Sequence, residues 1–141
     1  MQRGRRLAFD FGDVRIGVAV CDPDAILASP VITLRSSDKD LMKQVSRLCD
    51  EYQPIAIYIG SPSNMDGSSG GAVEKVQAFG QRVGAISNAP ITYIDERLST
   101  VSAARDMRDS GVSAKDSKSR IDQAAAVAIL EFALSLEKKR S

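Results

Sequence analysis

The sequence predicts an α/β fold in which a five-stranded mixed sheet is flanked by helices. Two apolar runs separated by a Gly-Asp pair open the chain, and a nearly continuous apolar run follows near its middle. Apolar residues recur at helical spacing between and after these runs. The chain has 141 residues, of which 43% are hydrophobic and 26% charged, an ordinary balance for a globular protein. It has no internal repeat and no change of composition, so we expect one domain over 1–141.

The two opening runs, Leu7–Phe11 and Val14–Cys21, predict a pair of strands. Gly12–Asp13 between them suits a tight turn, because glycine adopts positive φ without a steric penalty. The elements expected after this pair are a strand from Ser29 or Pro30 to Arg35, a helix over 38–52, a strand over Ile55–Gly60, a loop over Ser61–Gly71, a helix from Val73 to Val83, a strand over Pro90–Asp95, a helix from Ser99 or Thr100 to Gly111, a polar connector over Val112–Lys118 and a helix over 120–138.

The connections between these elements indicate how the sheet is assembled. Short links between the first three strands favour an antiparallel meander. The apolar run Ile55–Gly60 is typical of a parallel strand that is covered on both faces. Ser36 or Ser37 offers an N-cap to the helix that follows the meander. Three strands followed by alternating helices and strands is the element order of the ribonuclease H-like architecture, in which the first strand is central and the fourth and fifth add parallel to it.

Acidic residues occur where the parallel strands of this architecture end. Asp10 lies inside the first apolar run, and Asp95 and Glu96 end the fifth strand. Ligands of such sheets gather at the carboxyl ends of the parallel strands. We therefore expect Asp10, the loop Ser61–Gly71 and the Asp95–Glu96 pair to meet at one edge. Because neighbouring residues of a strand face opposite ways, Asp95 and Glu96 do not both enter one site unless the strand has already ended.

The absence of histidine restricts the chemistry that these acids can perform. It excludes His-based triads, His general acid–base catalysis and His-ligated zinc within one chain. Two divalent ions held by three or four carboxylates can hydrolyse a phosphodiester without histidine, and Mg²⁺ suits such a site because it takes oxygen ligands. The candidate ligands are Asp10, one of Asp95 and Glu96, and Asp122, with Asp13 as a further acid nearby.

Each acid also has a purely structural explanation. Asp10 is placed to cap the turn that follows it. Ser119 and Asp122 have the spacing of a capping box at the start of the last helix. Glu96 is adjacent to Arg97, with which a surface ion pair would contribute little to stability. The functional interpretation therefore depends on the placement of three acids at one edge of the fold.

Charge, hydropathy and cysteine usage narrow the class of protein. The net charge is +1, which does not by itself indicate a nucleic-acid binder. Between Arg97 and Arg120 there are six basic residues and three acids, a surplus that either faces phosphates or forms a solvated helix surface.

No apolar run has the length of a membrane span, and no signal peptide is recognised. Cys21 and Cys49 have no metal-site spacing and are expected to be buried reduced thiols of a cytoplasmic protein.

Four motifs resemble those of the YqgF/RuvX family in order and spacing. They are DFGDVRIGVAVCD at Asp10–Asp22, GSPSNMDGSSG at Gly60–Gly70, DERLST at Asp95–Thr100 and DQAAAVAIL at Asp122–Leu130. The resemblance covers essentially the whole chain, and four ordered motifs together are highly specific. The family has the ribonuclease H-like fold. It is described as nucleases that process precursor 16S rRNA and, in older naming, as Holliday junction resolvases.

This resemblance implies roles for individual residues. The implied catalytic and metal-binding acids are Asp10, Glu96 and Asp122, with Mg²⁺ or Mn²⁺ as the cofactor, and the implied substrate-binding residues are Arg15, Asn64 and Arg97. The implied partner is nucleic acid, either structured RNA or branched DNA, bound by a monomer or a homodimer. Asp13 departs from the Lys, Thr or small residue usual in the family, and it adds negative charge beside Asp10.

The leading prediction is a metal-dependent nuclease that trims the 5′ end of precursor small-subunit rRNA. A junction resolvase would use the same acids but would need two sites related by a dimer axis. A non-catalytic module of ribosome assembly would retain the acids for stability. A nucleotide-binding protein of the actin/hexokinase type shares the Asp-x-Gly turn, but such proteins need two such halves and a far longer chain.

Overall fold

The computed structural model describes residues 1–61, 71–98 and 115–140. Its elements are β1 (Arg6–Phe11), β2 (Arg15–Cys21), β3 (Ala28–Arg35), α1 (Leu41–Tyr52), β4 (Ala56–Ser61), α2 (Gly71–Ile86), β5 (Ile91–Asp95), the short 3₁₀ helix η1 (Glu96–Leu98) and α4 (Lys115–Arg140). The helix expected from Ser99 or Thr100 to Gly111 lies outside the described residues, as does Asn64.

The strand order β3-β2-β1-β4-β5 places β1 at the centre of the sheet. β1 and β2 are antiparallel, as are β2 and β3, whereas β4 runs parallel to β1 and β5 runs parallel to β4. The predicted three-strand meander with two parallel additions is therefore confirmed. This arrangement brings the carboxyl ends of β1, β4 and β5 to one edge.

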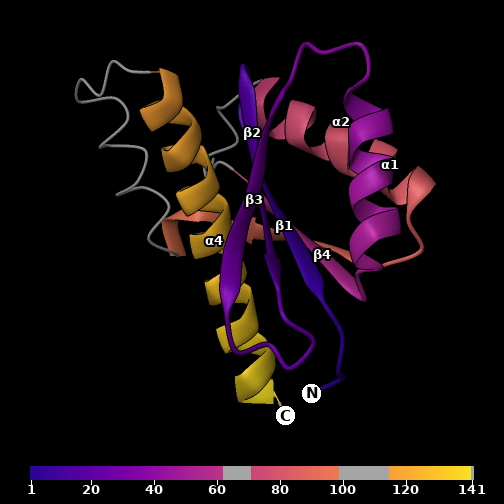
Figure 1. Ribbon diagram of the computed structural model, residues 1–141, viewed down its shortest axis with the longest axis vertical. Helices are drawn as coiled ribbons and strands as arrows, with labels where there is room; N and C mark the ends of the chain where they lie inside the picture. The colour runs from indigo at the N-terminus through magenta and orange to yellow at the C-terminus, as the bar shows by residue number, and fades with distance from the viewer. Residues whose placement is uncertain (62–70, 99–114, 141) are drawn as a thin grey trace.

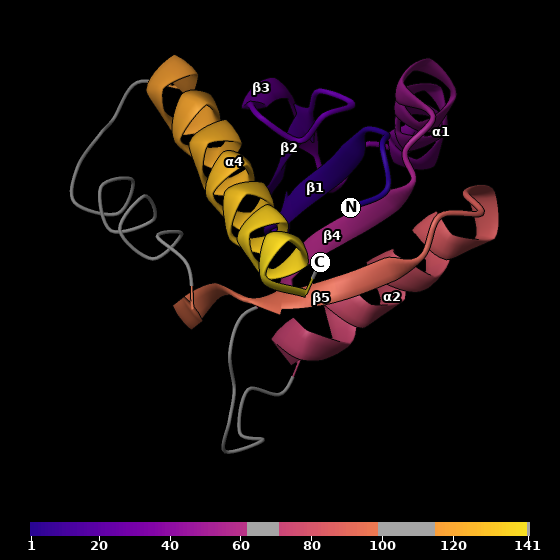
Figure 2. The ribbon, with the colours of Figure 1, turned by 90° about the horizontal axis from the view of Figure 1, so that it is seen from below.

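Helices cover both faces of the sheet (Figures 1 and 2). α1 and α2 lie on one face and α4 crosses the other. Leu7 and Phe9 of β1 belong to the core shared with α1 and α2, and Phe9 meets Phe79 of α2 edge to face at 5.5 Å between ring centroids. Ala8 belongs to the core under α4. Because side chains alternate along a strand, Asp10 lies on the α4 face with Ala8.

Helix α1 begins later than the sequence predicts, at Leu41 rather than at 38. Its N-cap position is Asp40, so the predicted cap by Ser36 or Ser37 is wrong. The hydroxyl of Ser36 instead donates a 2.6 Å hydrogen bond to the carbonyl of Gly12. A serine after a strand is equally able to cap a helix or to bond a nearby turn, and here the turn between β1 and β2 lies within reach.

Helix α4 is longer than predicted, because it begins at Lys115 and ends at Arg140. Ser119 therefore lies inside the helix, and the capping-box explanation of Asp122 is wrong. Thr33 of β3 connects the N-terminal half of α4 to the sheet through two hydrogen bonds. Its hydroxyl donates to the carbonyl of Ser119 at 2.9 Å and accepts from the side-chain amide of Gln123 at 3.1 Å.

The C-terminal half of α4 is bound to the sheet by a buried polar cluster that the sequence did not predict. Arg6 of β1 is 1% exposed, and its guanidinium contacts both carboxylate oxygens of Glu137, at 2.8 and 3.3 Å. The Tyr58 hydroxyl donates to the same carboxylate at 2.5 Å. Burial, and then the hydrogen bond to Glu137, raise the pKa of Tyr58 above its ordinary value. Thr33 at one end and Arg6 at the other thus hold α4 at a defined position over the sheet.

The cysteines and the apolar character of the helices complete the description of the fold. Cys21 and Cys49 are free and buried, as predicted. Across 1–61, 71–98 and 115–140, no helix combines the length and the apolar character needed to cross a bilayer.

Candidate active site

The candidate site is organised around Asp10, which is 1% exposed at the centre of the sheet. Asp10 pairs with Gly17 on β2 and with Gly60 on β4. The same row continues to Thr33 on β3 and to Ile94 on β5. Both immediate neighbours of Asp10 therefore lack a side chain on the face that α4 covers, which lets other elements pack closely beside this buried carboxylate.

The missing side chain of Gly17 allows α4 to approach the sheet backbone. A Cβ built on Gly17 would lie only 2.0 Å from the carbonyl oxygen of Asp122 and 3.0 Å from the nitrogen of Gln123. The helix backbone therefore packs directly on β2 beside Asp10. The side chain of Asp122 is 1% exposed in this position. The backbone of Asp122 thus lies over β2, beside the strand that carries Asp10.

The missing side chain of Gly60 makes room for Ile129 of α4 and for the third acid. A Cβ on Gly60 would lie 2.3 Å from Cδ1 of Ile129 and 3.3 Å from Oε1 of Glu96. Glu96 is 7% exposed, which rules out the surface ion pair considered for it. It is the first residue of η1, immediately after β5 ends. The structure thus brings Asp10, Glu96 and Asp122 to the same face and the same edge, around the Gly17–Asp10–Gly60 row.

The neighbouring acids Asp95 and Asp13 are each paired with a basic side chain outside the cluster of Asp10, Glu96 and Asp122. Asp95 accepts hydrogen bonds from the guanidinium of Arg97 at 2.9 and 3.3 Å, and this pairing holds the pKa of the Asp95 carboxyl below its ordinary value. Asp13 lies in the turn after β1, where Lys75 of α2 contacts it at 3.1 Å. Glu96, rather than Asp95, is therefore the member of the pair that faces the site, in agreement with strand alternation.

The predicted substrate-binding residues have different surroundings. Arg15 starts β2 on the α4 face, and its Nε donates to Oδ2 of Asp122 at 2.6 Å. Arg97 is half exposed at the same edge and is held by Asp95. The structure thus places Arg15 inside the acid cluster and Arg97 at its margin.

Three buried carboxylates offer the oxygen donors that a hard divalent cation prefers. Gly17 and Gly60 let the backbone of Asp122 and the side chain of Glu96 approach the row of Asp10 closely. In the part of the chain that the structure describes, however, no three Asp, Glu, Cys or His side chains have the spacing of a preformed metal cage. The donor chemistry therefore fits a Mg²⁺ or Mn²⁺ that takes part of its coordination shell from water and substrate phosphates.

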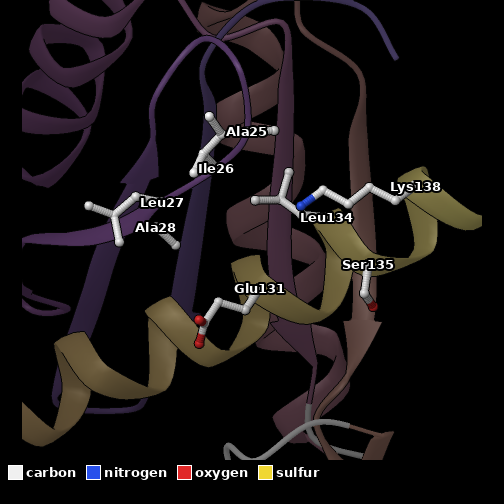
Figure 3. Close-up of a pocket in the computed structure, with 8 residues that line it drawn as sticks. All are labelled: Ala25, Ile26, Leu27, Ala28, Glu131, Leu134, Ser135 and Lys138. Carbon is white, nitrogen blue, oxygen red and sulfur yellow. The ribbon is translucent and has the colours of Figure 1, made fainter.

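A hollow at the opposite end of the sheet is not part of this site. It has a volume of about 200 Å³, and Figure 3 shows Ala25–Ala28 on one side of it and α4 side chains, including Glu131 and Lys138, on the other. It lies where β2 ends and β3 begins, whereas Asp10 lies near the carboxyl end of β1. Its lining does not include the three acids, and we assign no chemistry to it.

The glycines are the site residues that the sequence analysis missed. Gly17 and Gly60 lie within strands, where glycine lacks a side chain to pack and commonly marks a close approach of another backbone. Both glycines lie within apolar runs, so the sequence does carry this signal. It does not reveal which segment packs against each glycine, because α4 and η1 approach from distant parts of the chain.

Comparisons with known proteins identify the family to which the chain is similar. A family model described as "RuvX: Holliday junction resolvase" matches residues 4–136. A Streptomyces avermitilis protein named "Putative pre-16S rRNA nuclease" is 48% identical over 140 residues, which cover 98% of this chain and 90% of the relative. A protein of the same name from Streptomyces coelicolor is 47% identical over 98% of this chain and 84% of the relative.

Solved structures show the same fold at low sequence identity. The structure described as "T. thermophilus RuvC in complex with Holliday junction substrate" superposes with a TM-score of 0.63 at 15% identity, and the alignment covers 96% of both chains. A second Thermus thermophilus RuvC structure gives 0.60 at 14% identity, again over 96% of both chains. These likenesses confirm the ribonuclease H-like fold. With a family model that matches 133 of its residues, 4–136, the chain belongs to the RuvX family.

Proposed function

We propose that the protein is a metal-dependent nuclease that hydrolyses phosphodiester bonds through Asp10, Glu96 and Asp122. The observation that carries the proposal is the convergence of these three buried carboxylates around the Gly17–Asp10–Gly60 row. Membership of the RuvX family supports it. In a chain without histidine, carboxylates and a hard metal are a self-sufficient means of phosphodiester hydrolysis.

In this proposal each acid has a distinct position in the metal site. Asp10 presents its carboxylate from the rigid centre of the sheet, Asp122 from the helix that covers it, and Glu96 from the end of β5. Bound Mg²⁺ or Mn²⁺ would supply Lewis acidity that activates a water molecule and stabilises the leaving oxygen. Arg15 and Arg97 would contact substrate phosphates, since guanidinium groups match phosphate geometry. Asn64 would donate a hydrogen bond to the substrate from its side-chain amide.

The proposed substrate is the 5′ end of precursor 16S rRNA. Support comes from the relatives at 47 and 48% identity, which carry the name of a pre-16S rRNA nuclease. We propose that the chain acts as one nuclease domain over 1–141 in the cytoplasm, where buried free thiols such as Cys21 and Cys49 remain reduced.

A second candidate function is resolution of branched DNA. The description of the matching family as a Holliday junction resolvase favours it. Resolution requires two coordinated cuts, so this activity would need a homodimer with two sites, whereas trimming of RNA would also be possible for a monomer. Sedimentation of the protein alone and with a four-way junction would show which assembly forms.

The test is cleavage of a precursor rRNA fragment and of a four-way DNA junction, side by side, with Mg²⁺, Mn²⁺ or EDTA. Asp10→Asn should lower the rate by more than the 10–100-fold typical of losing an outer-shell partner of a metal ligand. Asp13→Asn is the matched control. It removes the same charge nearby, but Asp13 lies in an exposed turn and is bound by Lys75, so we expect the rate to be retained.

The outcomes separate the candidate functions. Metal-dependent cleavage of RNA alone that requires Asp10 supports the rRNA nuclease. Cleavage of junctions alone with the same requirement supports the resolvase. If a folded wild-type protein binds either nucleic acid but cuts neither, the nuclease proposal fails and a binding module of ribosome assembly takes its place.

A further inference from the structure

We propose that Arg15 occupies the place of a cation at Asp122. In the metal-free protein its guanidinium neutralises this carboxylate, and a divalent ion must displace it before Asp122 can act as a ligand. The inference rests on the proposed nuclease function and adds a regulatory step to that site. Its consequence is that metal binding releases Arg15 toward the substrate phosphates.

The contact between Arg15 and Asp122 is short, and it joins a partly exposed guanidinium to a buried carboxylate. Nε of Arg15 lies 2.6 Å from Oδ2 of Asp122, slightly below the roughly 2.7–2.9 Å typical of a charge-assisted N–H···O hydrogen bond. Asp122 is 1% exposed, whereas the Arg15 side chain is 25% exposed. An ionised carboxylate at that depth needs a compensating charge. Arg15 supplies one from the solvent side, where an incoming ion would also arrive.

The fold positions Arg15 to take part in the site rather than in the hydrophobic core. It lies two residues before Gly17 on β2, so both face α4. Gly17 is in turn the partner of Asp10 and packs on the backbone of Asp122. A side chain that starts at position 15 and ends on Asp122 therefore borders the space around the three acids.

Displacement of Arg15 would change the set of oxygen donors that the site offers. Although three acids converge here, no described triad has the spacing of a preformed metal cage. Release of Asp122 from Arg15 would free a carboxylate oxygen for an ion. A guanidinium binds carboxylate and phosphate with the same geometry, so the released Arg15 can exchange one anion for the other without rebuilding its surroundings.

A purely structural role for Arg15 predicts the opposite response to its removal. If Arg15 only holds Asp122 in position, its loss would misplace a ligand and weaken metal binding. If Arg15 competes with the ion, its loss would strengthen metal binding. The sign of the change in metal affinity therefore distinguishes the two roles.

The test is Mn²⁺ binding by calorimetry to wild type, Arg15→Gln and Arg35→Gln, without nucleic acid. Arg35 is the exposed cross-strand partner of Arg15, so its variant removes the same charge from the adjacent position. We expect Arg15→Gln to bind Mn²⁺ about tenfold more tightly, the factor that corresponds to a hydrogen bond to a charged group. Arg35→Gln should stay within about twofold of wild type, as a screened surface charge does.

A spectroscopic measurement tests displacement directly and does not depend on a variant that folds. In isotope-labelled wild type, the Nε–H resonance of Arg15 should report a hydrogen bond without metal and should move toward the position of a solvated guanidinium as Mg²⁺ is added. The Nε–H resonance of Arg6, which is bound to Glu137 in the other half of α4, serves as the internal reference.

Each outcome has a defined meaning. Weaker or unchanged Mn²⁺ binding by Arg15→Gln, an equal gain in Arg35→Gln, or an Arg15 resonance that does not respond to Mg²⁺ would overturn the inference. The nuclease proposal would survive these results if wild type still binds metal and cuts nucleic acid. Failure of every protein to bind Mn²⁺, together with no cleavage, would instead remove the proposed function itself.

Discussion

The carbonyl oxygen of Asp122 packs against the Cα of Gly17, with no room for a side chain between helix α4 and strand β2. A Cβ at position 17 would lie 2.0 Å from that oxygen, well inside van der Waals contact. The contact determines how deeply α4 sits on the sheet. It therefore also determines how close Asp122 comes to Asp10, the register partner of Gly17.

Replacing Gly17 by alanine should push α4 away from the sheet. Because the obstructing atom is backbone rather than a flexible side chain, we expect a loss of at least the roughly 1–3 kcal/mol typical of overpacking. Any metal affinity that depends on Asp122 should fall as well. Urea denaturation gives the stability, and calorimetry with Mn²⁺ gives the affinity.

Gly84→Ala is the matched control for this substitution. Gly84 lies in α2, and a Cβ there would meet Cδ1 of Ile91 at 3.4 Å, an ordinary contact. Alanine at this helical position should be neutral or should stabilise by up to about 1 kcal/mol. Similar stability of the two alanine variants would show that α4 does not pack on Gly17 as described.

The buried pair of Arg6 and Glu137 should behave as one unit in a double-mutant cycle. Glu137→Leu leaves the guanidinium of Arg6, which is 1% exposed, without its carboxylate, and should cost about 3–5 kcal/mol. The combined Arg6→Met, Glu137→Leu protein should lose less than the sum of the two single substitutions, because no buried charge remains. Additive losses by urea denaturation would contradict the coupling.

The carboxyl of Asp95 should titrate below its ordinary pKa of 3.8 because Arg97 donates hydrogen bonds to it. A depressed folded-state pKa means that this contribution to stability is present above about pH 4 and is lost as the pH falls through the folded value. In Arg97→Gln, NMR titration should show the pKa of Asp95 rising toward 3.8. An unchanged pKa would show that Arg97 does not bind Asp95 in solution.

The two cysteines should be unreactive in the folded protein. Burial raises the pKa of the Cys21 and Cys49 thiols above the ordinary 9.0, so little thiolate forms near neutral pH. A thiol reagent such as DTNB should label neither cysteine rapidly in buffer and both in urea. Rapid labelling of either thiol in native buffer would show that its element opens readily, and single Cys→Ala variants would identify which one.

The sequence by itself determined the order and direction of the strands. The period of the apolar runs and the positions of Gly12 and Pro54 identified the meander and the buried parallel strand, because these signals are local. It also placed Asp10 within the central strand. Strand alternation indicated that Asp95 and Glu96 do not both enter the site unless the strand has already ended, and it did not say which of them enters.

Only the tertiary structure decided how the acids are assembled. The start of α4 at Lys115 removed the capping role proposed for Asp122, and the docking of that helix on Gly17 brought Asp122 to the site. The end of β5 at Asp95 turned Glu96 toward Gly60. Arg15 and Asp122 are 107 positions apart, so their contact depends on strand register and helix docking together. These relationships are non-local, and no periodicity within a short segment specifies them.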